Sequence, residues 1–396
     1  MSSPVKYIPE TTSVFDSLLI SDNNRINHLI VRNQSDEITG MLRTNDIHKA
    51  VVKSLSYLLG SIRQCKTEIE LKLCYEKLQK LINPLIQNDV SVKYITNFTT
   101  AFSDAIIRRL IELTIYESGE PHIEFTFICL GSEGRKEGTL FTDQDNAIIY
   151  KDVSKEEDLT VNAFLLRLGE KVCNSLNFIG YSFCKGNIMA KNQKWCQPLS
   201  AWQKYFKEWI TAPEPQNLLD ATVFFDFRAI YGDEMITENL RKSIMEYISD
   251  NNLFLYHLAY NTYNTKHPHI SSGNILSDRN TDMIDLKSAV SPIIMFARTY
   301  SLQNGIISTN TIDRLNVLKE KHILPKDTVD EIIYTYNFLM KLRFRNQAEL
   351  LRNHSPLTNS LNTKGLIDPE LILLKKVLSY IPEYQNKIKT DFRIST

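Results

Sequence analysis

The sequence predicts an α+β protein, in which a small mixed sheet and its helices are flanked by helical regions and preceded by a short α/β unit. Three observations lead to this fold class. Two apolar strands enclose a polar turn within residues 124–150. Apolar residues recur at three- and four-residue spacing through 51–118 and 251–382, which indicates amphipathic helices. Two short runs, 28–32 and 38–42, read as strands joined by a polar turn.

Composition sets the broad limits. The chain of 396 residues is long enough for two or three domains, each with its own core. Basic and acidic residues balance at 46 each, so nothing indicates a nucleic-acid partner. No apolar run approaches the ~18 residues of a membrane span, and the N-terminus has no apolar signal segment. We therefore expect a cytoplasmic protein without a membrane partner, whose six cysteines are reduced and lack the spacing of a metal site.

The first predicted domain covers residues 1–50. Its strands carry the stretches INHLIVRN and EITGMLRTND, and Thr44 to Asp46 follow as the cap of a helix over 47–59. This unit resembles one CBS motif. In that family a Thr or Ser and an Asp at the strand–helix junction hold the ribose and phosphate of an adenine nucleotide, which implies that role for Thr44 and Asp46. The alternative is that both residues only cap the helix.

CBS motifs normally pack in pairs, and the sequence shows one. Either the chain is a piece of a longer protein whose missing part carries the other motif, or two copies complete each other as a homodimer. We expect the first of these arrangements.

The second predicted domain, residues 51–118, is helical. A first helix is expected to end at Pro84, because proline disrupts a helix interior. A second helix is expected from about Ser91 to Tyr116. Gly119 to Pro121 then mark a boundary, which leaves 119–235 as the core domain and 236–396 as a C-terminal helical domain.

Within the core domain, residues 161–178 read as a helix behind the sheet and 180–184 as a further strand. The tryptophans at 195, 202 and 209 recur at sevenfold spacing, which predicts an apolar core row rather than a base-stacking surface. Asp226 and Arg228 stand inside an apolar run. They are either a buried ion pair or site residues, because an unpaired buried charge is costly.

Two carboxylates mark the candidate site. Asp143 and Asp145 lie two residues apart at the start of an apolar strand, so both side chains point to the same face. Like charges held together are unfavourable unless a cation lies between them. Hard oxygen ligands of this kind suit Mg²⁺, which takes carboxylates together with phosphate oxygens.

A phosphate-binding turn is predicted opposite the carboxylates. Gly131 and Ser132 follow the first apolar strand, where glycine permits a close approach and backbone amides with the hydroxyl can bind phosphate. Arg135 adds a charge suited to a phosphate oxygen or a ribose. The combination fits in-line attack on a nucleoside triphosphate assisted by metal ions.

The stretch GSEGRKEGTLFTDQDNAIIY closely resembles the motif of the DNA polymerase beta-type nucleotidyltransferase superfamily. The nearest branch is similar to the PII-uridylyltransferase and glutamine-synthetase adenylyltransferase group, and more narrowly to signal-transduction nucleotidyltransferases that follow CBS pairs. The stretches FFDFRAIYGD, IDLKSAVSPIIMFARTYSL and LRFRNQ extend the resemblance. It implies a polymerase-beta-type core with Mg²⁺ or Mn²⁺ on catalytic Asp143 and Asp145. It also implies a nucleotide-binding set made of Gly131, Ser132, Arg135, Glu137 and Thr142.

One feature of the superfamily is missing. Many members add a third carboxylate on a later strand, and the expected strand over 180–184 has none. Asp226 is the remaining candidate for this catalytic position. Without a third carboxylate the acceptor hydroxyl lacks an obvious general base.

The leading functional hypothesis is transfer of a nucleoside monophosphate from ATP or UTP to a hydroxyl on a partner protein, regulated by nucleotide binding at the CBS unit. Two alternatives stay open. One is a signalling module that binds nucleotide without catalysis, and the other is an adenylyltransferase for a small molecule.

Overall fold

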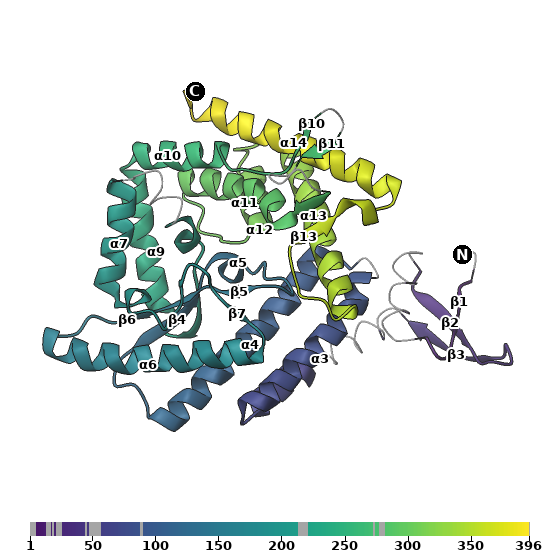
Figure 1. Ribbon diagram of the computed structural model, residues 1–396, viewed down its shortest axis with the longest axis horizontal. Helices are drawn as coiled ribbons and strands as arrows, with labels where there is room; N and C mark the ends of the chain where they lie inside the picture. The colour runs from purple at the N-terminus through teal and green to yellow at the C-terminus, as the bar shows by residue number, and fades with distance from the viewer. Residues whose placement is uncertain are drawn as a thin grey trace. The chain divides into compact units, whose positions relative to one another are not determined.

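A computed structural model describes residues 5–12, 17, 20, 26–43, 46, 57–87, 90–212, 221–271, 274–276 and 282–395. The chain divides into two compact units, Met1–Arg109 and Leu110–Thr396. Each unit combines helices with short strands, as Figure 1 shows, in agreement with the predicted mixed α+β class. The candidate site lies in the second unit.

The first unit begins with a three-stranded sheet in the order β1-β2-β3. Its strands are β1 (Tyr7–Pro9), β2 (His28–Arg32) and β3 (Ile38–Arg43). The two predicted strands, now β2 and β3, are confirmed as an antiparallel pair, and β1 joins β2 in parallel. Thr44 and most of the following helix lie outside the described residues, so the resemblance to a CBS motif stays a prediction.

Two long helices follow, α3 (Glu68–Gln87) and α4 (Val92–Ser118). The second matches the predicted helix, but the expectation that Pro84 ends the first was wrong, since α3 continues to Gln87. Leu85 and Ile86, which follow the proline, are buried. The favourable free energy of burying these apolar side chains offsets the cost of the hydrogen bond that proline removes from a helix.

The core of the second unit is a four-stranded sheet in the order β8-β6-β4-β9. Its strands are β4 (Phe125–Cys129), β6 (Asn146–Tyr150), β8 (Cys196–Pro198) and β9 (Arg228–Gly232). Strand β4 pairs antiparallel with β6 and β9, and β8 runs parallel to β6. Every residue of β4 and β6 is buried, so both faces of the sheet are covered.

Alternate residues of these strands pack on different helices. Ile128 and Ile149 belong to a cluster with the apolar side chains of α7 (Leu199–Thr211) and α9 (Glu234–Ser249). On the other face the Tyr150 hydroxyl donates to Asp158 on α6 (Lys155–Ile179). The predicted tryptophan row is confirmed as core packing, because all three rings lie in or against the same cluster.

Helices form the C-terminal part of the unit. They are α10 (Asn252–Tyr263), α11 (Leu286–Gln303), α12 (Thr311–Glu320), α13 (Lys326–Arg352) and α14 (Asp368–Asp391). Helix α11 contacts the other four and is buried along most of its length (Figure 1). Two short antiparallel strand pairs accompany the helices, β10 (His269–Ser271) with β11 (Asn274–Leu276) and β12 (Met283–Asp285) with β13 (Ser360–Asn362).

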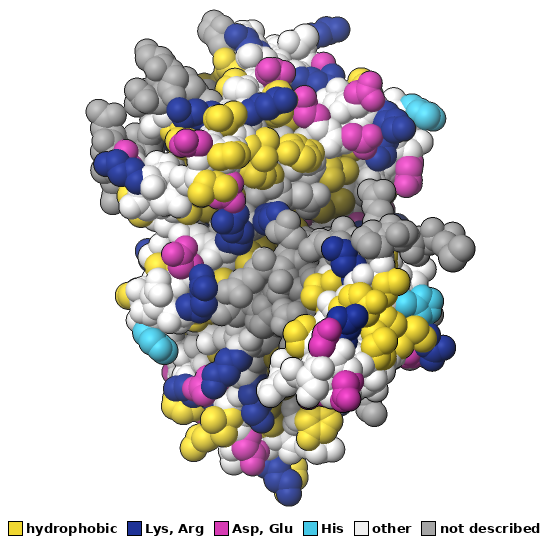
Figure 2. Space-filling model, turned by 90° about the vertical axis from the view of Figure 1, so that its right-hand side faces the viewer, with side chains coloured by type: hydrophobic (Ala, Val, Ile, Leu, Met, Phe, Trp, Pro, Cys, Tyr) yellow, Lys and Arg dark blue, Asp and Glu magenta, His cyan; other side chains and the backbone are white. Residues whose placement is uncertain are grey.

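One face of the molecule is mixed in charge. On the face shown in Figure 2, Lys and Arg side chains are interspersed with Asp and Glu side chains and with apolar groups. Neighbouring opposite charges weaken each other's long-range field, so this face offers little electrostatic steering for either sign. None of the helices in the described ranges combines the length and hydropathy needed to cross a bilayer.

A buried ion cluster joins the core sheet to the C-terminal helices. The carboxylate of Asp226 is fully buried and accepts hydrogen bonds from Arg135 Nη1 (2.9 Å) and from Arg298 Nε of α11 (3.2 Å). It also pairs with Arg314 Nη2 of α12 at 2.7 Å. Burial alone would raise the pKa of Asp226, but the three guanidinium groups outweigh burial and hold that pKa well below its usual range.

Asp226→Asn is therefore expected to lower the free energy of unfolding by about 3–5 kcal/mol, because it leaves buried arginines without their shared countercharge. Denaturant unfolding of the full chain measures this effect. The matched control is Asp330→Asn, which removes the exposed 2.8 Å pair with Lys319 and should cost less than about 1 kcal/mol. Equal small losses in both variants would contradict the role assigned to the cluster.

Candidate functional site

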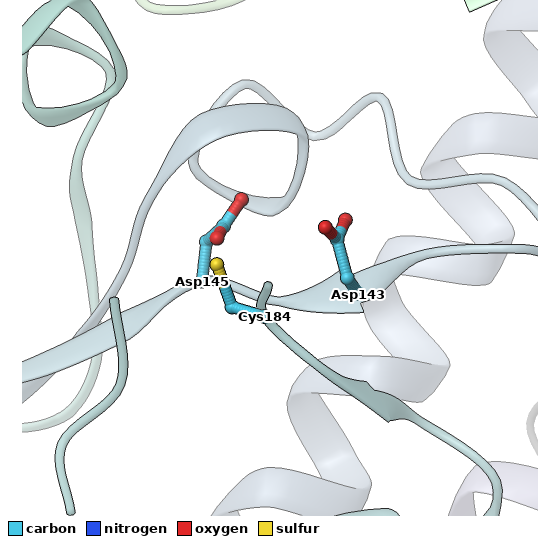
Figure 3. Close-up of side chains that lie close together, drawn as sticks. All are labelled: Asp143, Asp145 and Cys184. Carbon is cyan, nitrogen blue, oxygen red and sulfur yellow. The ribbon is translucent and has the colours of Figure 1, made fainter. Parts of the chain in front are cut away.

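The two aspartates of the motif meet at one edge of the core. Asp143 belongs to β5 (Asp143–Gln144), and Asp145 lies between β5 and β6. Figure 3 shows both carboxylates projecting from the same side of the strand, as the two-residue spacing predicts. Ligand atoms of Asp143, Asp145 and Cys184 all lie within 4.8 Å of one another.

Cys184 is the member of this group that the sequence reasoning missed. It follows β7 (Ser182–Phe183), which pairs in parallel with β5 so that Asp143 faces Ser182 and Gln144 faces Phe183. The next position in this register sets Cys184 beside Asp145, and its thiol makes a hydrogen bond to that carboxylate. The superfamily pattern points to a carboxylate on the predicted strand over 180–184, but the free thiol at the end of this strand can also bind a metal ion.

The electrostatics of the site favour a bound cation. Burial, followed by repulsion from Asp143, raises the pKa of Asp145 to about 6. Burial and the neighbouring Asp145 raise the pKa of the Cys184 thiol to about 11. A positive side chain lies close to this pair, since Lys287 Nζ of α11 is 3.9 Å from Asp143 Oδ1. The two carboxylates fit a divalent ion of the hard class, and the thiol adds a donor that softer ions prefer.

A tight turn packs directly against Asp145. It is the short helix α5 (Gly131–Gly134), and the Leu130 amide at its start donates to the Asp145 carbonyl at 2.9 Å. Gly131 has φ +56°, and a Cβ there would lie 3.0 Å from Asp145 Oδ2. Only glycine permits both this backbone conformation and this approach. The predicted turn residue Gly131 is thus brought to Asp145, and Ser132 follows it in the turn and is partly exposed.

Arg135 and Glu137 point elsewhere. The Arg135 guanidinium is buried and donates from Nε to Glu137 Oε2 (2.8 Å) as well as from Nη1 to Asp226. Glu137 Oε1 accepts the Thr311 amide of α12 at 2.6 Å. These side chains, predicted to bind nucleotide, therefore have carboxylate or backbone partners that link the motif to the C-terminal helices.

Asp226, the predicted substitute for a third carboxylate, lies in the arginine cluster and outside the group of Asp143, Asp145 and Cys184. Its lowered pKa makes it a poor proton acceptor. Both observations argue against a catalytic role. Within the described residues, the group around Asp143 contains no third carboxylate.

The remaining predicted residues have local partners. The Thr142 hydroxyl accepts the Thr139 amide at 2.9 Å and closes the turn that leads into Asp143. Asp46 pairs with Arg43 at 2.8 Å on the first unit. Thr44, its predicted companion, lies outside the described residues.

Comparison with known families yields two matches. Residues 76–216 match the family described as "Putative nucleotidyltransferase DUF294", and this range contains α5, β5 and the three clustered side chains. Residues 252–392 match the family described as "Putative nucleotidyltransferase substrate binding domain", which covers helices α10 to α14. A search of curated proteins found no match.

The raised pKa of Asp145 predicts a stabilising Asp145→Asn substitution. Between pH 3.8 and about 6, Asp145 is protonated in the folded protein but ionised in the unfolded chain, where its pKa is 3.8. The stability of the wild type therefore falls as the pH rises through this range. At pH 8 in EDTA, Asp145→Asn should be more stable than wild type by about 3 kcal/mol, since the pKa rises by about two units and each unit corresponds to about 1.4 kcal/mol. Denaturant melts should show this advantage vanishing near pH 3.5. A less stable variant at pH 8 would contradict the electrostatic account.

The donor set predicts a role for sulfur in binding soft metals. Cd²⁺ titrated into the full chain should produce a thiolate-to-metal charge-transfer band, and Cys184→Ser should reduce this band and weaken Cd²⁺ binding at the site about tenfold or more. Binding of Mg²⁺ should change little, because hard cations rely on the carboxylates. Glu124→Gln, a substitution in the exposed pair with Lys151, is the control that should leave both unchanged. A band of unchanged intensity in Cys184→Ser, with unchanged Cd²⁺ affinity, would exclude Cys184 as the ligand.

Proposed function

From two domain matches that support a nucleotidyltransferase family, we propose that this protein moves a nucleoside monophosphate from ATP or UTP to a hydroxyl on a partner protein. The observation that carries the proposal is the convergence of Asp143 and Asp145 beside the Gly131 turn. The matches support nucleotidyl transfer in general, and the acceptor, the metal dependence and the regulation belong to the proposal.

In the proposed reaction the acceptor oxygen bonds to the α-phosphorus as the bond from that phosphorus to the bridging oxygen breaks. Pyrophosphate leaves with the bonding electrons, and the hydroxyl proton passes to water. Asp143 and Asp145 would hold Mg²⁺ or Mn²⁺, which supplies charge neutralisation at the phosphate oxygens when it is bound. Gly131 keeps the turn close to these carboxylates, and Ser132 is the turn residue whose hydroxyl would contact the triphosphate.

Regulation forms a separate part of the proposal. It depends on the resemblance of residues 1–50 to a CBS motif and assigns Thr44 and Asp46 to an adenine nucleotide. The antiparallel pair β2 and β3, which leads to this junction, supports it. Added AMP should then change the rate of transfer, and Asp46→Ala should remove this response without changing the basal rate.

A second candidate function is favoured by one observation. In the described part of the chain no third carboxylate joins Asp143 and Asp145, and Asp226 is held by arginines. A site without a general base can bind a metal-bound nucleotide and transmit a signal without turnover. This reading predicts nucleotide binding with no transfer.

The test is incubation of the full chain with α-labelled ATP or UTP, Mg²⁺ or Mn²⁺, and a lysate of its own cell. We expect label on a protein band, reduced about a hundredfold or more in Asp143→Ala, because a group that stabilises developing charge is lost. Glu124→Ala, which removes an exposed carboxylate, should behave as wild type. Label on a small molecule would show that the acceptor is that molecule and not a protein. Nucleotide binding without transfer in the presence of either metal would refute the enzyme proposal.

A further inference from the structure

Two cations of the C-terminal helices interact electrostatically with Asp143 of the motif. Lys287 is the second residue of α11, and its Nζ lies 3.9 Å from Asp143 Oδ1. Its backbone amide donates to Asp285 Oδ1 at 2.8 Å, which fixes the first turn of the helix. The side chain is 60% exposed, so its ammonium group can reach a ligand as well as Asp143.

Arg343 of α13 is the second cation. Its Nε donates to Asn359 Oδ1 at 2.7 Å, and the Asn359 carbonyl accepts the Leu286 amide at 2.9 Å. Two hydrogen bonds thus connect Arg343 to the residue that precedes Lys287. Asp285 and Asp143 are close enough to act on its charge.

The orientation of α13 supports this placement. Tyr336 lies seven residues before Arg343, on the same face of the helix, and makes a hydrogen bond to Glu137. The face of α13 that carries both residues is therefore turned toward the motif loop between α5 and β5.

Arg343 differs from the other buried arginines of the site region. Arg135, Arg298 and Arg314 share Asp226, whereas Arg343, which is also buried, forms no salt bridge within the described ranges. Its one hydrogen bond to a described residue uses Nε and leaves the two terminal nitrogens for a ligand. Burial lowers the pKa of Arg343 to about 10, which still leaves it charged near neutral pH. A buried charge that forms no salt bridge is costly, and an anionic ligand would compensate it.

We propose that Lys287 and Arg343 bind the terminal phosphates of the nucleotide, across from the metal-binding carboxylates. The inference deepens the proposed function and rests on it. Arginine suits this role because its planar fork of donors matches phosphate oxygens, and lysine adds a mobile point charge. Arg135, which sequence reasoning assigned to the phosphate, is already occupied by Glu137 and Asp226. The leaving pyrophosphate would then be held by residues of the C-terminal domain.

The direct test uses inorganic triphosphate with Mg²⁺ as the probe, titrated into the full chain by calorimetry. Lys287→Met and Arg343→Met should each weaken binding about tenfold or more, because each removes charge-assisted hydrogen bonds. Arg345→Met, two residues along α13 in an exposed pair with Glu370, and Lys204→Met, on α7, are the controls that should bind as wild type. Lys287 is largely exposed, so its variant tests the idea even if Arg343→Met fails to fold.

Nucleotides provide a second readout. Both variants should lose affinity for ATP while their weaker affinity for AMP, which lacks the terminal phosphates, changes by less than about twofold. Triphosphate binding at wild-type strength in both variants, or no binding by the wild-type chain, would overturn the inference. Variant-sensitive binding without label transfer would leave the inference standing and remove the proposed enzyme activity. Label transfer that depends on Asp143 but on neither Lys287 nor Arg343 would support the proposed enzyme activity and overturn the inference.

Discussion

The position of the candidate site depends on one buried carboxylate. Asp226 joins three arginines that come from the loop after α5, from α11 and from α12. Because the Arg135 end of this cluster immediately follows the α5 turn, the cluster fixes the turn and the C-terminal helices with respect to each other. Gly134 permits the close approach, since a Cβ there would lie 1.9 Å from the Asp226 carbonyl oxygen.

The short stretch from Gly131 to Glu137 therefore serves two purposes. Gly131 and Ser132 stay beside Asp145, where a phosphate would bind, whereas Arg135 and Glu137 connect the stretch to α11 and α12. Charged residues of a motif need not touch a substrate to be required by the site. Here their charges are satisfied within the protein, and their contribution to function is the placement of neighbouring groups.

The parts of the site that could be predicted are formed by residues that lie close together in the sequence. The convergence of Asp143 and Asp145 follows from strand geometry, and the turn at Gly131 follows from its place after an apolar strand. The partners of Asp226 lie 91, 72 and 88 residues away, at Arg135, Arg298 and Arg314, and no local pattern indicates them. Cys184 could not be predicted for another reason. The sequence indicates its strand, but the superfamily pattern places a carboxylate there, and a lone cysteine carries no spacing signal of a metal site.

The charges around Asp143 explain why a second domain would be needed at this site. Two clustered carboxylates repel a triphosphate, and a single divalent ion does no more than cancel their charge. Further positive charge has to come from side chains, and the arginine nearest in sequence, Arg135, is bound to Glu137 and Asp226. Lys287 and Arg343 belong to the domain matched as substrate-binding, and they supply this charge only when α11 and α13 are held against the motif loop. The ion cluster at Asp226 ensures that placement, so a structural carboxylate away from the metal-binding pair would control whether the nucleotide can bind.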